Sequence, residues 1–185
     1  MKLEKKRDFV ITNIVASASL GLELDLFQIH DKVKDVEYEP EQFPGAILKF
    51  DEPKATLLLF KNGKVVCVGC KKKSQMEQAV EKARKMLLPY AKKILTTRKP
   101  KIEITNIVAA AELGLTLDLY KIAEKADNVE YEPEQFPGAI LKFRDPKVSL
   151  LLFKNGKVIC AGAKTEEEIR KALGMAKRAL KSYSE

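Results

Sequence analysis

Apolar residues occupy both faces of the strands predicted in the middle of the chain. In the segment Ala55–Phe60, Leu57 falls on one face and Leu58 on the other. The segment Lys64–Gly69 also has apolar residues on both faces. Hairpin-linked strands form antiparallel sheets, in which apolar and polar residues usually alternate. Helices can cover one face of such a sheet, so the other face needs a different cover. The sequence leaves three alternatives for burying this second face. It could line the inside of a closed barrel or sandwich, form a symmetric protein interface, or contact nucleic acid.

Each half of the chain is predicted to contain a strand, a short helix, several short strands and a long helix. The predicted elements are strand Ile11–Ser19, helix Leu24–Val33, strands Val36–Glu39, Ala46–Phe50, Ala55–Phe60 and Lys64–Gly69, and the long helices Gln75–Leu95 and Glu166–Lys181. Asn62-Gly63 predicts a type I′ hairpin turn, because these residue types tolerate positive φ. Ser74 with Glu77, and Thr165 with Glu168, predict capping boxes that do not align between the halves.

The second half of the chain repeats the first. Val36–Phe50 recurs unchanged as Val129–Phe143, and most flanking positions also match at the same offset without a gap. Two tandem copies indicate a pseudo-twofold molecule, because a solenoid needs three or more repeats. We expect residues 1–95 to form the first repeat, with a short N-terminal extension, and residues 96–185 to form the second.

The overall charge narrows the choice of partner. The 185 residues are 45% hydrophobic, which suffices for a core, and carry a net charge of +8. This charge favours a polyanionic partner such as nucleic acid or an anionic membrane surface, unless the lysines only face water. No apolar run approaches the about 20 residues of a membrane span, and no signal-peptide pattern opens the chain. We therefore expect an intracellular protein with no membrane partner, in which the three cysteines need not pair.

Metal, redox and enzymatic functions find little support in the sequence. Cys67 and Cys70 form a C-x-x-C pattern, but residues three apart on a strand are expected on opposite faces, and only Cys160 is kept in the second repeat. His30 is the single histidine, and Ala123 replaces it in the second repeat. Neither a Gly-rich phosphate loop nor a nucleophile–base pair is evident. We expect no enzyme activity, no cofactor and no metal site.

Three motifs occur in order and in duplicate: Asn-Ile-Val-Ala from Asn13, Tyr-Glu-Pro-Glu-x-Phe-Pro-Gly-Ala-Ile from Tyr38, and Leu-Leu-Phe-x-x-Gly-Lys-Val from Leu58. With them, the chain from about Arg7 to Ser182 closely resembles the TATA-box-binding protein family, and its near-identical halves resemble the archaeal branch. The resemblance implies an α+β, pseudo-twofold saddle: a curved ten-stranded antiparallel sheet with four helices on its convex face. It also implies a general transcription initiation factor that binds the TATA-box minor groove beneath the concave face and bends the DNA, as members of this family do.

The resemblance further implies roles for individual residues. Phe43, Phe60, Phe136 and Phe153 correspond to rings that wedge between base steps. Asn13 and Asn106 correspond to the central pair that hydrogen-bonds minor-groove acceptors, a chemistry that prefers A·T because G·C adds an amino group. The implied apolar floor comprises Val15, Leu58, Val66, Val68, Val108, Leu151, Ile159, Ala161, Pro44 and Pro137, and the implied phosphate contacts are Lys49, Lys64, Lys71, Lys142, Lys157 and Lys164. Val68 and Ala161 stand where eukaryotic members often place threonines, so those side-chain hydrogen bonds cannot form.

Protein partners are implied in the same way. Transcription factor B is expected at Glu132, Glu134 and Gln135, with RNA polymerase recruited indirectly. Glu39 and Glu41 repeat these glutamates, so the local sequence does not decide which loop is used. The apolar concave face also suits a homodimer of the free protein, and an archaeal member would act at the nucleoid in the cytoplasm. A rival reading is a protein-interaction scaffold of the same fold that does not bind DNA, but the four phenylalanines and two asparagines argue against it.

Overall fold

The computed structural model describes residues 8–184 of the chain. The first half contains β1 (Phe9–Ser19), β2 (Leu22–Leu24), α1 (Leu26–Lys32), β3 (Val36–Glu37), β4 (Ala46–Phe50), β5 (Ala55–Leu59), β6 (Lys64–Cys70), α2 (Lys73–Leu87), η1 (Leu88–Tyr90) and β7 (Ala91–Ile94). The second half contains β8 (Glu103–Glu112), α3 (Leu119–Lys125), β9 (Val129–Glu130), β10 (Ala139–Arg144), β11 (Lys147–Leu152), β12 (Lys157–Ala163), α4 (Glu166–Leu180) and η2 (Lys181–Tyr183). The second half therefore repeats the order of the first, as the internal repeat predicts, except that β2 and β7 have no counterpart strand among the described residues.

Ten strands form one hydrogen-bonded sheet, and two form another. The order in the large sheet is β3-β4-β5-β6-β1-β8-β12-β11-β10-β9, while β2 pairs with β7 separately. Each end of the large sheet is a two-residue strand, so in the described residues the sheet stays open and the closed-barrel alternative is excluded. Short edge strands of this kind also limit unwanted pairing with other chains.

The chain divides into two compact units. Among the described residues, one unit is formed by residues 13–105, and the other by residues 106–184 together with residues 8–12. The first residues of β1, Phe9–Thr12, thus belong with the elements of the second half. The boundary expected between the sequence repeats at residues 95 and 96 stays a prediction.

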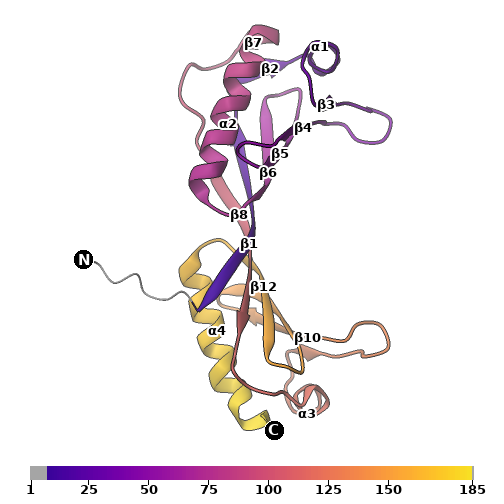
Figure 1. Cartoon of the computed structure of the whole chain (residues 1–185), viewed down its shortest axis with the longest axis vertical. Helices are drawn as coiled ribbons and strands as arrows, with labels where there is room; N and C mark the ends of the chain where they lie inside the picture. Colours follow the sequence, from indigo (N-terminus) through magenta and orange to yellow (C-terminus); the bar gives the residue numbers. More distant parts are fainter. Residues whose placement is uncertain (1–7, 185) are drawn as a thin grey trace, which may run out of the picture. The chain divides into compact units, whose positions relative to one another are not determined.

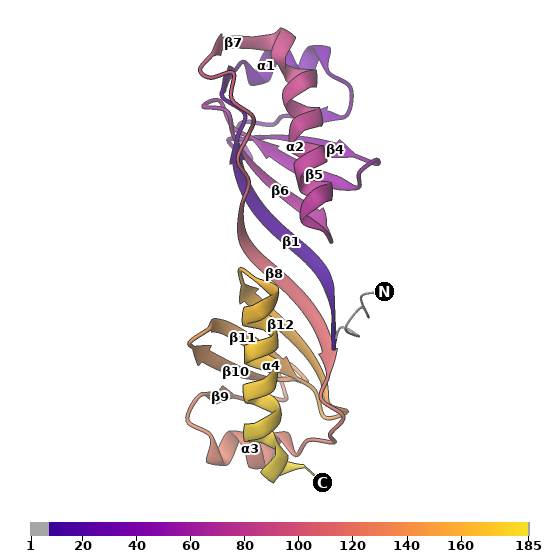
Figure 2. The same ribbon diagram turned by 90° about the vertical axis from the view of Figure 1, so that its left-hand side faces the viewer.

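In the unit formed by residues 13–105, α2 lies across one face of strands β4 to β6 (Figures 1 and 2). Leu57 and Leu59 of β5 are fully buried there, together with Met76 and Val80 of α2. Leu58, the residue between the two leucines, is only half-buried. The helix therefore covers one of the two apolar faces and leaves the other without a cover among the described residues of this unit.

The other unit is built in the same way, with α4 across β10 to β12 (Figure 1). Leu150 and Leu152 are buried with Ile169 of α4, whereas Leu151 is half-buried. The starts of α2 and α4 are also equivalent: Gln75 Oε1 accepts from Lys71 N, and Glu168 Oε2 accepts from Lys164 N. The two helix starts thus align between the repeats, because α2 begins at Lys73 and not at the predicted Gln75.

The first predicted long helix is wrong in length and in its cap. Helix α2 begins at Lys73, so Ser74 lies inside the helix and does not cap it, whereas Thr165 caps α4 as predicted by accepting from Glu168 N. The helix ends at Leu87 because Pro89 in the following turn cannot continue it. Residues 91–94 form β7, since the edge of β2 offers them backbone partners.

The predicted type I′ turn at Asn62-Gly63 is also corrected. Gly63 has φ 75, but Asn62 does not have a positive φ, as a type I′ turn would require. Gly63 N instead donates to Phe60 O, and Asn62 Oδ1 accepts from Lys64 N at 3.1 Å. Only the glycine needs the left-handed conformation, and Gly156 repeats it with φ 79.

The short helices start two residues later than the pattern predicts. Leu22–Leu24 is strand β2, and Asp25 caps α1 by accepting from Gln28 N at 3.2 Å. This backbone hydrogen bond is the main reason why the pKa of Asp25 lies below its usual value. Asp118 caps α3 in the same way. Among the described residues, no helix is long and apolar enough to cross a membrane.

Candidate nucleic-acid interface

The sheet face opposite α2 is apolar and half-buried. It carries Val15 of β1, Leu58 of β5, and Val66 and Val68 of β6. Leu58 lies directly across from Val66, and Val68 lies across from Thr56. The structure therefore brings together, on one face, the floor residues predicted for this repeat, while Pro44 is exposed in the loop before β4.

The unit that contains α4 presents an equivalent face. Val108, Leu151 and Ala161 are half-buried there, and Ile159 is 36% exposed. Leu151 lies across from Ile159 in the strand register, and Pro137 is exposed like Pro44. The apolar floor predicted for the second repeat is thus also assembled on one face.

Sequence reasoning missed two members of these faces. Ile47 of β4 is half-buried and lies across from Leu58, and Ile140 of β10 is half-buried and lies across from Leu151. The alternation of side chains in Ala46–Phe50 contained this signal, because Ile47 falls on the face opposite Leu48.

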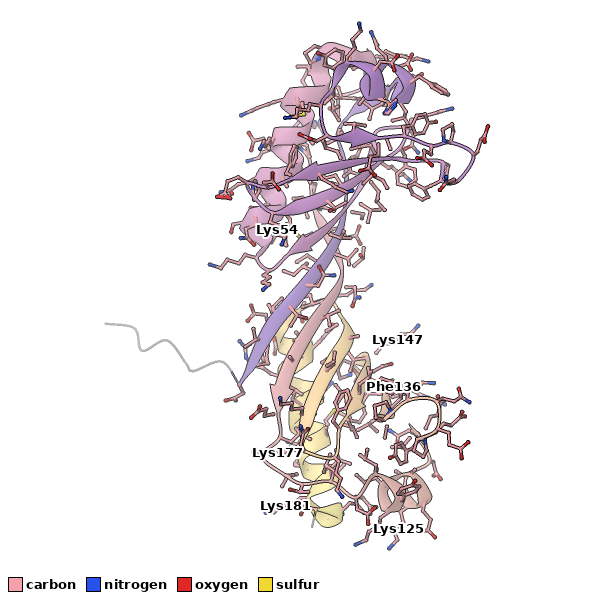
Figure 3. All side chains as sticks on the ribbon, turned by 45° about the vertical axis from the view of Figure 1, so that its right-hand side comes forward. Lys54, Lys125, Phe136, Lys147, Lys177 and Lys181 are labelled. Carbon is pink, nitrogen blue, oxygen red and sulfur yellow. The ribbon has the colours of Figure 1, made fainter. Side chains whose placement is uncertain are left out.

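The four predicted wedge phenylalanines form two pairs, one in each unit. Phe43 and Phe60 have ring centroids 5.9 Å apart with an interplanar angle of 67°, and Phe136 and Phe153 have the same values. One ring of each pair comes from the loop before β4 or β10, and the other directly follows β5 or β11. Figure 3 shows Phe136 beside the loop that precedes β10. An edge-to-face pair fixes the directions of both rings while leaving them partly exposed.

A glycine makes room for each ring pair. A Cβ atom at Gly45 would lie 2.7 Å from Phe43 Cε1 and 3.2 Å from Phe60 Cε1, and Gly138 has the same close contacts with Phe136 and Phe153. Glycine is therefore required at these two positions for the present ring placement, because any larger residue would displace the rings.

The predicted hydrogen-bonding asparagines are held by backbone N–H groups. Gly69 N donates to Asn13 Oδ1 at 2.9 Å, and Gly162 N donates to Asn106 Oδ1 at 2.7 Å. Both glycines have a positive φ and lie at register shifts between β6 and β1 or between β12 and β8. Each amide oxygen thus accepts from the protein, and the Nδ2 group is the donor that each amide can offer to a ligand.

All six predicted phosphate lysines are exposed, but they differ in their surroundings. Lys49 Nζ is 2.9 Å from Glu37 Oε1, and Lys142 Nζ is 2.6 Å from Glu130 Oε1. No ion pair is formed by the other four within residues 8–184, and these are Lys64, Lys71, Lys157 and Lys164. The side chains of these four are thus available to an anion without breaking a contact.

The residues predicted to bind transcription factor B lie in the exposed loop between β9 and β10. Glu132, Glu134 and Gln135 are all exposed, and Glu132 O accepts from Gln135 N and Phe136 N. This turn joins the acidic residues to the phenylalanine pair. The first repeat has the same turn, in which Glu39 O accepts from Gln42 N and Phe43 N.

The expected separation of Cys67 and Cys70 is wrong. The bulge at Gly69 adds one residue to β6, so that Cys67 lies across from Ala16 and Cys70 across from Ile14, and both are buried on the same face. Burial raises the pKa of Cys67 to about 12 and that of Cys160 to about 11. Such thiols are poor metal ligands and nucleophiles at neutral pH. No group of three or more metal-binding side chains occurs among the described residues.

Comparison with known proteins agrees with this geometry. The family model described as "Transcription factor TFIID (or TATA-binding protein, TBP)" matches residues 8–90 and again residues 101–183. A TATA-box-binding protein of Sulfurisphaera tokodaii is 47% identical over 163 residues, which cover 88% of this chain and 81% of that protein. One of Archaeoglobus fulgidus is 43% identical over 165 residues, covering 88% of this chain and 89% of that protein.

A solved structure is also similar. The TBP of Methanococcus jannaschii superposes with a TM-score of 0.86 at 40% sequence identity, covering 95% of this chain and 99% of that chain. The two matches of the family model fall on the two sequence repeats, and the structural likeness extends over nearly the whole chain.

Proposed function

Because this chain belongs to the TATA-binding protein family of non-enzymatic, TATA-box-binding transcription factors, we propose that its half-buried sheet faces bind the minor groove of A·T-rich DNA and bend it. The observation that carries this proposal is the orientation of Asn13 and Asn106. Each amide oxygen accepts from a glycine N–H, so the Nδ2 group is the one that each amide can offer as a donor. A·T and T·A pairs show only acceptors in the minor groove, which matches this donor.

The apolar floor adds discrimination in the same direction. Side chains such as Val66 and Val68 press against base edges without offering an acceptor. The guanine amino group of a G·C pair would lose its hydrogen bonds with water on this surface, and it would also occupy space that an A·T pair leaves free. The lost hydrogen bonds with water and the steric clash both disfavour G·C pairs. The preference for A·T therefore does not depend on the asparagines alone.

The phenylalanine pairs supply the wedges in this proposal. Unstacking a base step costs a few kcal/mol, and an inserted aromatic ring replaces part of the lost stacking. Phe43 and Phe60 already stand together in edge-to-face contact, which limits the entropy lost when a base step opens around them. One such pair in each unit predicts two kinks in the bound duplex.

Lysines around the faces would hold the phosphates. Lys64, Lys71, Lys157 and Lys164 contribute without losing an ion pair within residues 8–184, whereas Lys49 and Lys142 must first be released from glutamates. Each released counterion adds to affinity, so binding falls with rising salt.

The proposal extends to the partners of the complex. The exposed turn at Glu132 and Glu134 would recruit transcription factor B, and RNA polymerase through it, at the nucleoid of an archaeal cell. Support comes from the acidic loop joined to a wedge ring by the turn at Glu132 O. The first repeat has an identical loop at Glu39 and Glu41, so experiment must decide which of the two loops binds transcription factor B.

A fluorescence assay of DNA bending tests the central claim. A duplex with a central TATA element and a matched G·C-rich duplex, each labelled at both ends, are titrated with the full chain. We expect energy transfer to rise with the TATA duplex at concentrations that leave the G·C-rich duplex unchanged. Equal responses of the two duplexes would rule out the proposed function.

A further inference from the structure

The apolar sheet faces of the two units differ in the row of side chains nearest the asparagines. In the unit of residues 13–105, Val68 of β6 lies across from Thr56 of β5. At the equivalent positions of the other unit, Ala161 of β12 lies across from Ser149 of β11. All four side chains are half-buried on the face opposite the long helix. We call each of these pairs the inner row of its unit.

Each inner row lies directly beside one of the two amide groups. Gly69, whose N–H donates to Asn13 Oδ1, directly follows Val68 in the chain. In the second repeat, the glycine that donates to Asn106 Oδ1 directly follows Ala161. A base pair that accepts from either amide therefore has the inner row of that unit as its neighbour.

The inner row of the second repeat is smaller than that of the first. Ala161 lacks both γ-methyl groups of Val68. Ser149 lacks the methyl group of Thr56 but keeps its hydroxyl. The backbone does not compensate, because β11 pairs with β12 in the same register as β5 pairs with β6. The second inner row is therefore recessed by these methyl groups relative to the first.

The neighbouring row of the same face does not continue this difference. In the first repeat this row pairs Ser17 with Val66, and in the second it pairs Ala110 with Ile159. Ile159 is larger than Val66, and it is 36% exposed. The loss of methyl groups in the second repeat is therefore confined to the row beside Asn106.

We propose that the second repeat accepts a G·C pair beside its amide, whereas the first repeat rejects it, so that the chain prefers one orientation on a DNA element with unequal halves. This inference rests on the minor-groove binding proposed above. The amino group of guanine projects into the minor groove, where an A·T pair leaves space. An amino group and a methyl group are similar in size, so Val68 collides with this group, while Ala161 leaves room for it. A clash directed against one ligand is an effective source of selectivity.

The hydroxyl of Ser149 adds to the tolerance of the second repeat. A guanine amino group that is pressed against apolar side chains loses its hydrogen bonds with water. The Ser149 oxygen is an acceptor in the recessed row and can replace one of these bonds. Thr56 carries the same acceptor, but Val68 across from it keeps the amino group away.

Three duplexes test the proposal with the full chain. The A·T duplex has an uninterrupted palindromic element, the one-G·C duplex has a G·C pair in one half of it, and the two-G·C duplex has G·C at the symmetric positions of both halves. The G·C position is moved stepwise outward from the centre of the element. Beside the amides, we expect one G·C pair to lower the affinity less than about threefold, because the chain turns to place it under the second repeat, and two to lower it about tenfold or more.

Energy transfer measures the orientation directly. A donor dye is attached through Gln28→Cys on α1, which leads into the edge strand β3, and an acceptor is placed at one end of the one-G·C duplex. Gln28 is exposed, whereas the three native cysteines are buried, so the dye reacts at the new position. We expect stronger transfer when the acceptor is at the A·T end than at the G·C end. Lys121→Cys on α3 is the matched label in the second repeat, and it should give the opposite result.

Exchange of the two inner rows should reverse the orientation. The exchanged variant carries Thr56→Ser and Val68→Ala in the first repeat, and Ser149→Thr and Ala161→Val in the second. We expect the Gln28→Cys label to report the G·C end in this variant.

Val68→Ala alone makes both rows tolerant, so it should raise the affinity for the two-G·C duplex at least about fivefold. Each affinity is expressed relative to the A·T duplex with the same variant, so that a general loss of binding or folding cancels. Val65→Ala is the matched control, since Val65 lies on the same strand but is buried on the opposite face. It should leave the orientation and the relative affinities unchanged.

The inference is overturned if no position of the G·C pair separates the one-G·C duplex from the two-G·C duplex, or if the labels report both orientations equally on the one-G·C duplex. It is also overturned if the exchanged variant keeps the original orientation, or if Val65→Ala changes the orientation as much as the exchange does. Equal affinity for the A·T duplex and for a duplex made only of G·C pairs would instead overturn the minor-groove function on which the inference rests.

Discussion

Asn13 and Gly69 are joined by a hydrogen bond in which the glycine N–H donates to the amide oxygen of the asparagine over 2.9 Å. Gly69 offers this N–H because it lies at a bulge with φ 91, where β6 has one more residue than its partner strand. The bulge therefore orients the amide before any ligand arrives. The Nδ2 group is the donor of this amide, and in the proposed complex it would donate to the minor-groove edge of an A·T pair.

Replacing Asn13 and Asn106 by aspartate should weaken binding to a TATA duplex by about tenfold or more, because two donors to base acceptors are lost and two negative charges are placed against those acceptors. One carboxylate oxygen can still accept from the glycine N–H, so the fold should be kept. The other oxygen would face the base acceptors and repel them. Affinity is measured by anisotropy, and folding by the thermal midpoint.

Gln78→Glu is the control for added negative charge, because Gln78 is an exposed amide on α2. It should lower the affinity for the TATA duplex far less than the double aspartate variant does. Similar losses in both variants would show that net charge, and not the amide donor, decides binding.

The paired substitution Phe43→Ala with Phe60→Ala should reduce DNA bending strongly. The two rings support one another, so removing both also loses an aromatic pair worth about 0.5–1.5 kcal/mol of folding free energy. Lys49→Ala should instead leave the bend unchanged and lower the slope of log affinity against log salt by about 0.9. Energy transfer across the labelled duplex measures the bend, and equal loss in both variants would mean that the rings are not wedges.

The glutamate beside Lys49 is expected to restrain DNA binding. Glu37 holds the Lys49 ammonium at 2.9 Å, and an exposed pair of this kind contributes at most about 1 kcal/mol to stability. Glu37→Gln should therefore raise the affinity for a TATA duplex a few-fold at low salt, with a smaller effect at high salt. Glu77→Gln, which removes a glutamate paired with Lys73 on α2, should not raise it.

Much of the fold was predictable because the local signals agreed with the tertiary structure. Ala46–Phe50 forms a strand with the predicted bounds, and Leu57 and Leu58 fall on the two faces that alternation assigns to them. The helix predicted for Gln75–Leu95 failed because its periodicity continued past Pro89. The edge of β2, which captures Ala91–Ile94, is a long-range partner that local periodicity does not reveal.

The candidate site was predictable in its residues but not in its geometry. The phenylalanines and asparagines were identified through the duplicated motifs, and their roles stay predictions. The structure pairs Phe43 with Phe60 and Phe136 with Phe153. The role of Gly69 was missed, because a bulge depends on the register between two strands distant in sequence. The same bulge reverses the expected facing of Cys70, which strict alternation had placed away from Cys67.

Charge reversal of Glu132 and Glu134 to lysine should weaken recruitment of transcription factor B to a TATA complex. The two residues are exposed in the loop before β10, outside the strands that carry the apolar face, so DNA binding should not fall. The same change at Glu39 and Glu41 is the matched control in the first repeat. A mobility-shift assay with both proteins measures recruitment, and equal effects of the two changes would mean that the partner does not distinguish the loops.

The buried thiols should make the folded chain less stable in alkali. Burial raises the pKa of Cys67 to about 12 from a value of 9.0, so above that lower pH the unfolded chain loses a proton that the folded chain keeps. This contribution to the free energy of unfolding is complete below pH 9.0 and declines as the pH rises from there. Denaturant unfolding between pH 8 and pH 11 should show a shallower decline for Cys67→Ala than for the unchanged chain. Ser74→Ala, an exposed change of similar size, should leave the decline of the unfolding free energy with pH unchanged. If the free energy of Cys67→Ala declined with pH as steeply as that of Ser74→Ala, the pH dependence could not be assigned to the buried thiol.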